Sequence, residues 1–264
     1  MYSTGPITLK REDRHEAIVN LLLGAGTASL DEMSDRFDVS RMTIHRDLDD
    51  LEREGVLRRV RGGATIEAGT QFQSGFSIRE RQDGAGKALM AEAALGLIEP
   101  GMTVMINDGS MAALLGGRLT ERVPVTVITN NAAIFERLKG AAGVSLILLG
   151  GEFSSQFNGF FGLLTESALA NLRADIAFIS CPAVLGTQAF HVDDKVVRAK
   201  HAMMASAQQN CLLVNHKRFG HSALHLLADL KAFDHIITDA RPAPEAMAPL
   251  DAAGITLTLP EGAA

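Results

Sequence analysis

Side chains that could bind DNA are concentrated in one short segment of the chain, residues 40–64. Arginine can hold a phosphate or a guanine through two parallel hydrogen bonds, and histidine can give or accept one. The candidate contact residues are Ser40, Arg41, Met42, Thr43, His45, Arg46, Arg58, Arg59 and Arg61. The last three arginines lie in a run without an acidic residue, although acids slightly outnumber bases in residues 1–65 as a whole. A charged surface on a three-helix bundle is the alternative interpretation.

The apolar spacing around these residues predicts the elements that position them. Ile44, Leu48 and Leu51 recur at helical spacing, so one face of this helix packs inward while Met42, His45, Arg46 and Asp49 point away. Ser40 can act as the N-cap. An amphipathic helix carrying Leu30, Met33 and Phe37 precedes it across the turn Asp38-Val39, which makes a helix-turn-helix.

Two further elements complete this predicted head. A helix from about Arg14 to Leu23 supplies Ile18, Leu21 and Leu22 to a small core. Gly55 is a plausible helix stop, and residues 56–63 have the pattern of a strand and hairpin, or wing. The sequence therefore predicts a winged helix-turn-helix domain over residues 10–65.

A second set of candidate residues follows apolar strands later in the chain. Six short apolar runs alternate with alanine-rich helical segments, which predicts a mainly parallel α/β domain covered on both faces. The runs are 104–106, 125–128, 146–149, 176–179, 212–214 and 236–238. Residues 66–86 are rich in Gly, Ser and Gln and lack a sustained period, so we expect a linker there and an effector-sensing domain over 87–260.

Ligands of open parallel sheets bind beyond the carboxyl ends of the strands. The loops at those ends hold Asp108, Gly109, Ser110 and Met111, then Thr129, Asn130 and Asn131, and then Gly150 and Gly151. Glycine and serine let backbone N–H groups approach a phosphate, and a helix N-terminus favours negative charge. Three such loops together favour a phosphate-bearing ligand.

Composition sets limits on the class of protein. The 264 residues are 47% hydrophobic and 21% charged with a net charge of −6, which fits a two-domain globular protein and excludes a polycationic coat for nucleic acid. No apolar run has the length of a membrane span, and the first ten residues lack a signal-peptide pattern, so we expect a cytoplasmic protein without a membrane partner. Cys181 and Cys211 are too far apart for a C-x-x-C motif and are expected to be buried and reduced.

The segment V-S-R-M-T-I-H-R-D-L-D-D-L-E-R-E-G-V-L-R-R-V-R-G-G-A resembles the N-terminal signature of the DeoR (GlpR) family of bacterial transcriptional regulators. One position departs from that pattern. Where the family usually carries paired arginines after the isoleucine, this chain has His45-Arg46. The departure implies an operator sequence different from the family's commoner ones.

The chain also resembles the effector domain of this family from about Lys87 to Asp239. The matching positions are Asp108-Gly109-Ser110, Thr129-Asn130, Gly150-Gly151 and Lys200. The resemblance implies the fold of sugar-phosphate isomerases and CoA transferases, and a phosphorylated sugar or polyol as ligand. Met111-Ala112 replaces the family's consecutive threonines, and residues 215–220 are only similar to its lysine-phenylalanine-glycine loop. There Lys217 and Arg218 could supply the positive charge that holds a phosphate.

Three other groups of residues allow different chemistry. His216, His221 and His225 have a spacing that could bind a metal ion, against the alternative of loop histidines. Cys181 could be a nucleophile near His191 or His201, against the alternative of a small buried strand-end residue. Asp193-Asp194 could bind sugar hydroxyls or form a turn. We predict no metal site and no cofactor.

The sequence therefore predicts a ligand-responsive repressor of a sugar or polyol operon rather than an enzyme. Its expected partners are double-stranded operator DNA, a phosphorylated sugar or polyol that releases it, and further copies of itself in a dimer or tetramer. The alternative function is a sugar-phosphate isomerase or transferase that carries a DNA-binding head.

Overall fold

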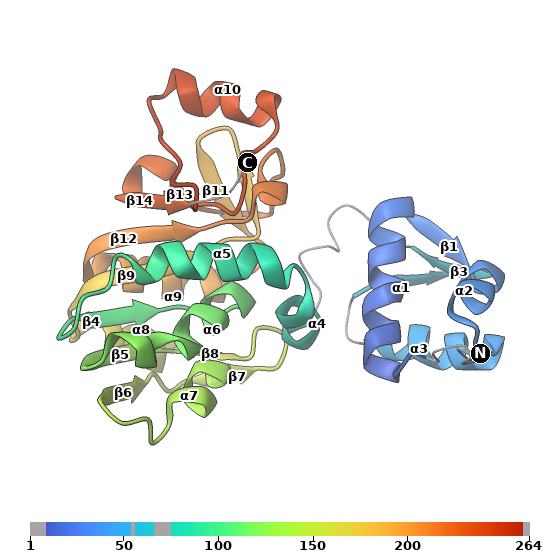
Figure 1. Ribbon diagram of the computed structural model, residues 1–264, viewed down its shortest axis with the longest axis horizontal. Coiled ribbons are helices and arrows are strands. Elements are labelled where there is room, and N and C mark those ends of the chain that lie inside the picture. Colours follow the sequence, from blue (N-terminus) through green and yellow to red (C-terminus); the bar gives the residue numbers. More distant parts are fainter. Residues whose placement is uncertain (1–8, 54–55, 66–74, 261–264) are drawn as a thin grey trace, which may run out of the picture. The chain divides into compact units, whose positions relative to one another are not determined.

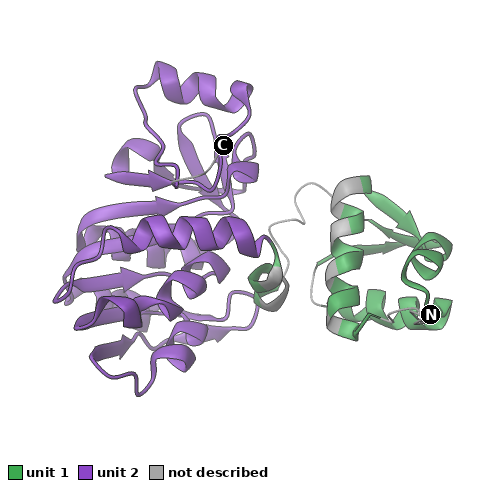
Figure 2. Ribbon diagram, viewed as in Figure 1, with its two compact units in different colours: residues 1–82 green, residues 83–264 purple. Residues whose placement is uncertain are grey.

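The computed structural model describes residues 9–53, 56–65 and 75–260. Its internal contacts divide the chain into two compact units, residues 1–82 and residues 83–264 (Figure 2). We call the first the head and the second the sensor unit. Across the described ranges, no helix combines the length and the apolar character needed to cross a membrane.

The head combines helices with a small antiparallel sheet in which β3 lies between β1 and β2 (Figure 1). In chain order the elements are α1 (Arg11–Ala25), β1 (Thr27–Ser29), α2 (Leu30–Phe37), α3 (Arg41–Arg53), β2 (Arg58–Val60) and β3 (Gly63–Thr65). A further helix, α4 (Phe76–Arg81), ends this unit. The predicted winged helix-turn-helix fold is confirmed.

The helix-turn-helix is stabilised by a buried apolar core and by a turn whose residues tolerate its conformation. Ile44, Leu48 and Leu51 of α3 are fully buried, and they pack in one cluster with residues of α1 and α2. The turn between α2 and α3 passes through Asp38, whose φ of 51° is a left-handed conformation that aspartate tolerates better than most residues. Ser40 then caps α3, since its Oγ accepts a hydrogen bond from the Thr43 backbone N–H at 3.1 Å. The predicted stop at Gly55 lies outside the described residues.

The wing is the hairpin of β2 and β3, with Val60 paired to Gly63 across a two-residue turn. The opposite edge of β3 pairs with β1, where the backbone of Gly63 lies very close to that of Ala28. A Cβ atom at position 63 would stand 2.1 Å from the Ala28 carbonyl oxygen, so only glycine allows this pairing. The wing is thereby joined through β1 to the connection between α1 and α2.

The sensor unit is built on a six-stranded parallel sheet in the order β14-β12-β9-β4-β5-β6 (Figure 1). Its strands are β4 (Thr103–Ile106), β5 (Val125–Thr129), β6 (Val144–Leu148), β9 (Ala174–Ser180), β12 (Ala207–Leu213) and β14 (His235–Ile237). Its helices are α5 (Gly84–Leu95), α6 (Ser110–Gly117), α7 (Ala132–Leu138), α8 (Leu163–Ala170), α9 (Asp194–Ala205) and α10 (Pro244–Ala252), with the short 3-10 turns η2 (Leu119–Arg122), η3 (His216–Arg218) and η4 (Leu230–Ala232). Each of the six apolar runs in the sequence is a strand of this sheet.

The strand order reverses direction between β4 and β9. From β4 the chain moves outward through β5 to β6, whereas from β9 it moves the other way through β12 to β14. Open α/β sheets bind ligands beyond the carboxyl ends of the two strands at such a reversal, which here are β4 and β9. This reversal determines which loops of the sensor unit meet.

Two small antiparallel sheets of the sensor unit are absent from the sequence prediction. One is the hairpin of β7 (Glu152–Ser154) and β8 (Gly159–Phe161), and the other contains β10 (Ala183–Leu185), β11 (Gln188–His191) and β13 (His225–Asp229). Residues 66–74 of the predicted linker lie outside the described residues. Its later part is helical in α4 and at the start of α5, where the sequence predicts no regular element.

Candidate DNA-binding face and effector site

The exposed side of α3 holds the residues that the sequence predicts to meet bases. Met42 is 63% exposed, Arg46 is exposed, the Asp49 side chain is half exposed, and His45 is partly buried. We call these four residues the outer face of α3. Their spacing of three or four residues puts them on one side of the helix, opposite the buried Ile44, Leu48 and Leu51.

The predicted arginines around this face have different surroundings. Arg41 pairs with Asp31 at the start of α2, and both side chains are largely exposed. Arg59 of β2 is turned back onto α3, where it contacts His45 and Asp49 and is only 26% exposed. Arg58 and Arg61 are exposed on the wing. Ser40 and Thr43 hydrogen-bond each other at the start of α3.

A buried ion cluster beneath this face was missed by sequence reasoning. The Asp47 carboxylate, which is 2% exposed, accepts two hydrogen bonds from Arg14, at 2.6 Å from Nε and 3.1 Å from Nη2. His15 Nε2 lies 3.0 Å from the same carboxylate. Arg14 and His15 belong to α1, so the cluster joins that helix to α3. Asp47 lies three residues after the buried Ile44, and that spacing is the sequence signal from which its burial could have been predicted.

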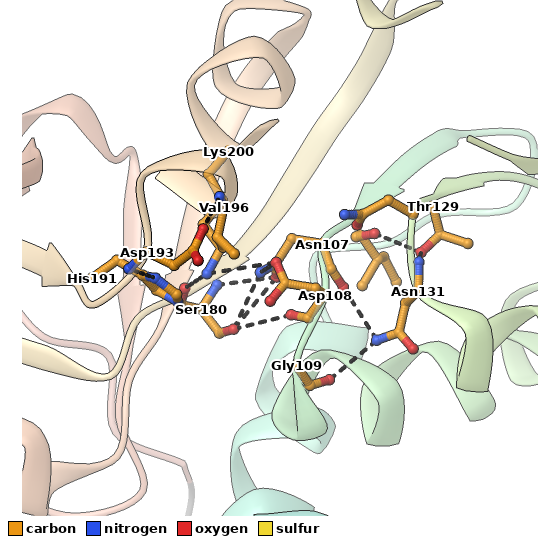
Figure 3. A network of polar contacts seen from close by, with 12 residues as sticks. Asn107, Asp108, Gly109, Thr129, Asn131, Ser180, His191, Asp193, Val196 and Lys200 are labelled. Carbon is orange, nitrogen blue, oxygen red and sulfur yellow. Dashed lines mark hydrogen bonds and ion pairs between the residues drawn. The ribbon is translucent and has the colours of Figure 1, made fainter. Parts of the chain in front are cut away.

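In the sensor unit, the polar residues gather at the reversal of strand order (Figure 3). Asn107, directly after β4, accepts a hydrogen bond through Oδ1 from the Ser180 backbone N–H at the end of β9, 3.1 Å away. Its Nδ2 donates to Ser180 Oγ at 3.3 Å and to Asp108 Oδ1 at 3.2 Å. Ser180 was not among the predicted residues, because the sequence does not reveal that β9 lies beside β4.

The loop after β5 reaches the same place. Asn131 Nδ2 donates to the carbonyl oxygen of Gly109 at 3.2 Å (Figure 3). Its Oδ1 accepts the backbone N–H of Ala133 and so caps α7. Thr129 donates its hydroxyl to the Ile106 carbonyl at 2.7 Å. Asn130 Nδ2 donates to the Phe160 carbonyl at 3.0 Å, but its buried Oδ1 has no hydrogen-bond partner within the described part of the chain.

A buried lysine and a buried carboxylate face each other across this site. Lys200 Nζ lies 3.7 Å from Asp108 Oδ1 and donates to the Ser180 carbonyl at 2.8 Å, and both charged side chains are 2% exposed. Lys200 is carried by α9, which Asp193 caps by accepting the Val196 backbone N–H at 3.0 Å. Asp194 instead pairs with Arg198. The charges of Asp108 and Lys200 offset each other, so this pair alone adds no net charge to the site.

Other predicted residues border the site from several sides. Ser110 begins α6, whose N-terminus has no side-chain cap, and Met111 is buried one residue later. Gly151 lies against β8, and Gly150 accepts a hydrogen bond from Thr165. Gly159 of β8 was not predicted, and its backbone lies close to the side chain of Asp108.

The loop after β12 brings positive charge to the neighbourhood of Cys181, the residue that follows Ser180. Both Lys200 and Arg218 act electrostatically on the Cys181 thiol. Burial lowers the pKa of Arg218, which is partly exposed, while Lys217 is exposed. Burial also raises the pKa of Cys181 to about 12, so the thiol stays protonated at neutral pH and is a poor nucleophile.

The three histidines considered as metal ligands lie in different surroundings. His216 lies 2.9 Å from the Asp239 carboxylate, His221 lies in a loop, and His225 begins β13 opposite His191 of β11. The helix that would put His221 and His225 on one face is not formed. Within the described ranges, no three His, Cys, Asp or Glu side chains are grouped so that they could hold a metal ion.

Comparisons with known proteins match both units. Residues 82–240 match the family model described as the DeoR C terminal sensor domain, and residues 14–69 match the DeoR-like helix-turn-helix domain. The chain is 30% identical to the L-fucose operon activator of Escherichia coli K12, over 86% of this chain and 95% of the relative. It is 26% identical to the glycerol-3-phosphate regulon repressor of the same strain, over 89% and 93%, and 29% identical to the lactose phosphotransferase system repressor of Lactococcus lactis, over 90% and 94%.

Similarity to solved structures is more distant. Ribose 5-phosphate isomerase A from Methanocaldococcus jannaschii has a TM-score of 0.37 and 19% identity, over 52% of this chain and 53% of that chain. The β subunit of eIF2B from Chaetomium thermophilum has a TM-score of 0.42 and 16% identity, over 57% and 47%.

Proposed function

The chain belongs to the DeoR family of transcriptional regulators, and we propose that it is a repressor released from its operator by a phosphorylated sugar or polyol. The observation that carries the proposal is the presence, in one chain, of a winged helix-turn-helix head and a sensor unit with polar groups converging at the reversal of its sheet. Relatives named as a lactose phosphotransferase system repressor and an L-fucose operon activator support the sugar class, and the one named as a glycerol-3-phosphate regulon repressor supports the polyol class.

For the head, we propose that α3 enters the major groove and that the wing contacts the DNA backbone. The outer face of α3 supports this role, because it combines an exposed arginine, a partly exposed imidazole and an exposed methionine on one side of the helix. A head of this size contacts few base pairs, so two heads in a homo-oligomer would bind paired half-sites.

For the sensor unit, we propose that the ligand's phosphate lies at the N-terminus of α6. Its first backbone N–H groups lack a side-chain cap, whereas α7 and α9 are capped by Asn131 and Asp193. Arg218 would add a charge-assisted contact. The unpartnered Oδ1 of Asn130 would accept a hydrogen bond from a ligand hydroxyl.

Ligand binding would lower operator affinity only if the ligand binds the released state more tightly than the DNA-bound state. The chain would therefore act by binding rather than by turnover.

The head is tested by fluorescence anisotropy on DNA from upstream of the protein's own gene. Arg46→Ala should weaken specific binding by roughly 1–3 kcal/mol if the side chain reads a base. The matched control is Arg241→Ala, which removes an exposed arginine from the sensor unit and should leave the affinity unchanged. Equal effects of the two variants would contradict the placement of α3 in the groove.

The sensor site is tested by calorimetric titration with a panel of phosphorylated sugars and polyols. Arg218→Met should weaken binding of the active compound, whereas Arg173→Met, which changes an exposed arginine after α8, should not. Conversion of any of these compounds by the purified protein would instead support an isomerase or transferase. The proposal predicts binding without conversion.

A further inference from the structure

One ring nitrogen of His45 is already occupied within the head. Arg59 Nη2 lies 2.6 Å from His45 Nδ1, which makes this a hydrogen bond between the wing and the outer face of α3. A guanidinium group has five N–H donors and no acceptor. The Arg59 side chain must therefore donate, and His45 Nδ1 must accept and carry no proton.

The donor is held in place by contacts that do not involve the imidazole. Arg59 Nη1 pairs with the Asp49 carboxylate, one helical turn beyond His45 on α3. The backbone N–H of Arg59 donates to Glu52 Oε1 at 2.7 Å, and β2 pairs with β3 through Arg59 and Ala64. Because Arg59 is fixed at its backbone and at its guanidinium, its bond to His45 is present before DNA arrives. The head thus sets the tautomer of the neutral ring in advance.

A neutral imidazole carries a single proton, so a ring whose Nδ1 accepts has its proton on Nε2. From this geometry we infer that His45 presents a lone N–H donor at Nε2 and reads a hydrogen-bond acceptor on a base edge. The acceptors of the major groove are guanine N7 and O6, adenine N7 and thymine O4. Cytosine presents a donor there and should be disfavoured at that operator position.

The charge of Arg59 suggests a direct contact with DNA, but its contacts within the head give it a different role. Arg59 acts through His45 as a positioning residue, because its guanidinium holds the imidazole and Asp49 and is largely buried against them. The reading role of His45 rests on the proposed function of α3. The tautomer of His45, in contrast, is a property of the free protein.

The tautomer is tested first, by long-range ¹H–¹⁵N correlation spectra of the ¹⁵N-labelled full-length protein at neutral pH. The chain has eight histidines, so the His45 signals are assigned by their loss in His45→Gln. We expect an unprotonated Nδ1 and a protonated Nε2. Arg59→Met keeps an unbranched apolar stem but removes the donors, and should give a mixture of tautomers.

The matched control for this spectrum is Arg58→Met, which changes the adjacent wing arginine and should leave the His45 signals as they are. A protonated Nδ1 in the unmodified protein would overturn the inference. So would a tautomer that stays the same in Arg59→Met, because the guanidinium would then not be what fixes it.

The reading role is tested on operator DNA in which single acceptors are removed. The substitutions are 7-deazapurines for N7, 2-aminopurine for guanine O6 and 5-methyl-2-pyrimidinone for thymine O4. At one position in each half-site, we expect the unmodified protein to lose roughly two- to tenfold in affinity, the typical effect of one hydrogen bond. His45→Ala should lose nothing further at that position, whereas Met42→Ala should remain sensitive.

The reading role would be contradicted if, at every removed acceptor, His45→Ala lost as much affinity as the unmodified protein. Failure of the proposed function has a different signature, since the unmodified protein then binds no DNA specifically. That outcome also removes the reading role, while the spectrum of the free protein still decides the tautomer.

Discussion

The buried carboxylate of Asp47 makes the stability of the head sensitive to a single substitution. Asp47→Ala removes the acceptor of two Arg14 bonds, at 2.6 and 3.1 Å, and of the His15 bond at 3.0 Å. The Arg14 side chain is only 8% exposed and would keep the Leu9 carbonyl, 3.0 Å away, as a partner. Removing one member of a buried ion pair costs about 3–5 kcal/mol. A domain of about 65 residues has roughly 3–10 kcal/mol of total stability, so much of it would be lost.

Hydrogen exchange of the full-length protein, followed by mass spectrometry, measures this loss. A cost of about 3–5 kcal/mol corresponds to exchange that is faster by about two to three and a half powers of ten in peptides of α1 and α3. Peptides of the sensor unit should not change, because they belong to a separate unit.

Asp50→Ala is the matched control for this experiment. Asp50 lies three residues further along α3 and also pairs with an α1 arginine, Arg11, but that arginine is largely exposed. Its removal should have a much smaller effect, since water screens exposed pairs. Equal acceleration in the two variants, or none in Asp47→Ala, would refute the reasoning that burial makes the Asp47 cluster important.

Three further predictions concern the sensor unit. Gly151→Ala should destabilise it strongly, since a Cβ there would stand 2.4 Å from both a backbone carbonyl oxygen and a threonine hydroxyl, and φ is +150°. Gly150→Ala meets nothing within 4 Å and should be tolerated, which thermal unfolding of the two variants would show or contradict. Cys181, whose pKa is raised to about 12 by burial, should react with iodoacetamide at pH 8 only after denaturant is added, and rapid labelling of the native thiol would contradict its burial. Lys200→Met should lower the midpoint of thermal unfolding by leaving the buried Asp108 without its counter-ion, and the midpoint should partly recover in the double variant with Asp108→Asn.

Sequence patterns were sufficient to predict the helix-turn-helix of the head and the parallel strands of the sensor unit. The helix-turn-helix follows from the apolar spacing of Ile44, Leu48 and Leu51 and from the Ser40 cap, and the six parallel strands follow from continuous apolar runs. These signals are local, and the physical causes act over a few residues. The short strands β7, β8, β10 and β11 have three or four residues each, too few for a period to be seen.

The contacts that define the sites depend on elements far apart in the chain. Asn107 meets Ser180 because β9 lies beside β4, and strand order is not encoded in any local period. Arg59 meets His45 because the wing folds back onto α3. The loop residues at the ends of β4 and β5 could be named from the sequence, but their partners could not. The burial of Asp47 was missed although a signal was present, because its spacing of three residues from Ile44 puts it near the inner face of α3.

The most direct test of the account is the operator dissociation constant, measured at fixed salt as a function of the concentration of each phosphorylated sugar and polyol. Salt must be held constant because phosphate contacts depend on it strongly. The account predicts specific binding that one compound weakens in a saturable manner. By linkage, that compound should bind the DNA-free protein more tightly than the complex by the same factor. Specific DNA binding that no compound changes, or turnover of a compound by the protein, would contradict the account.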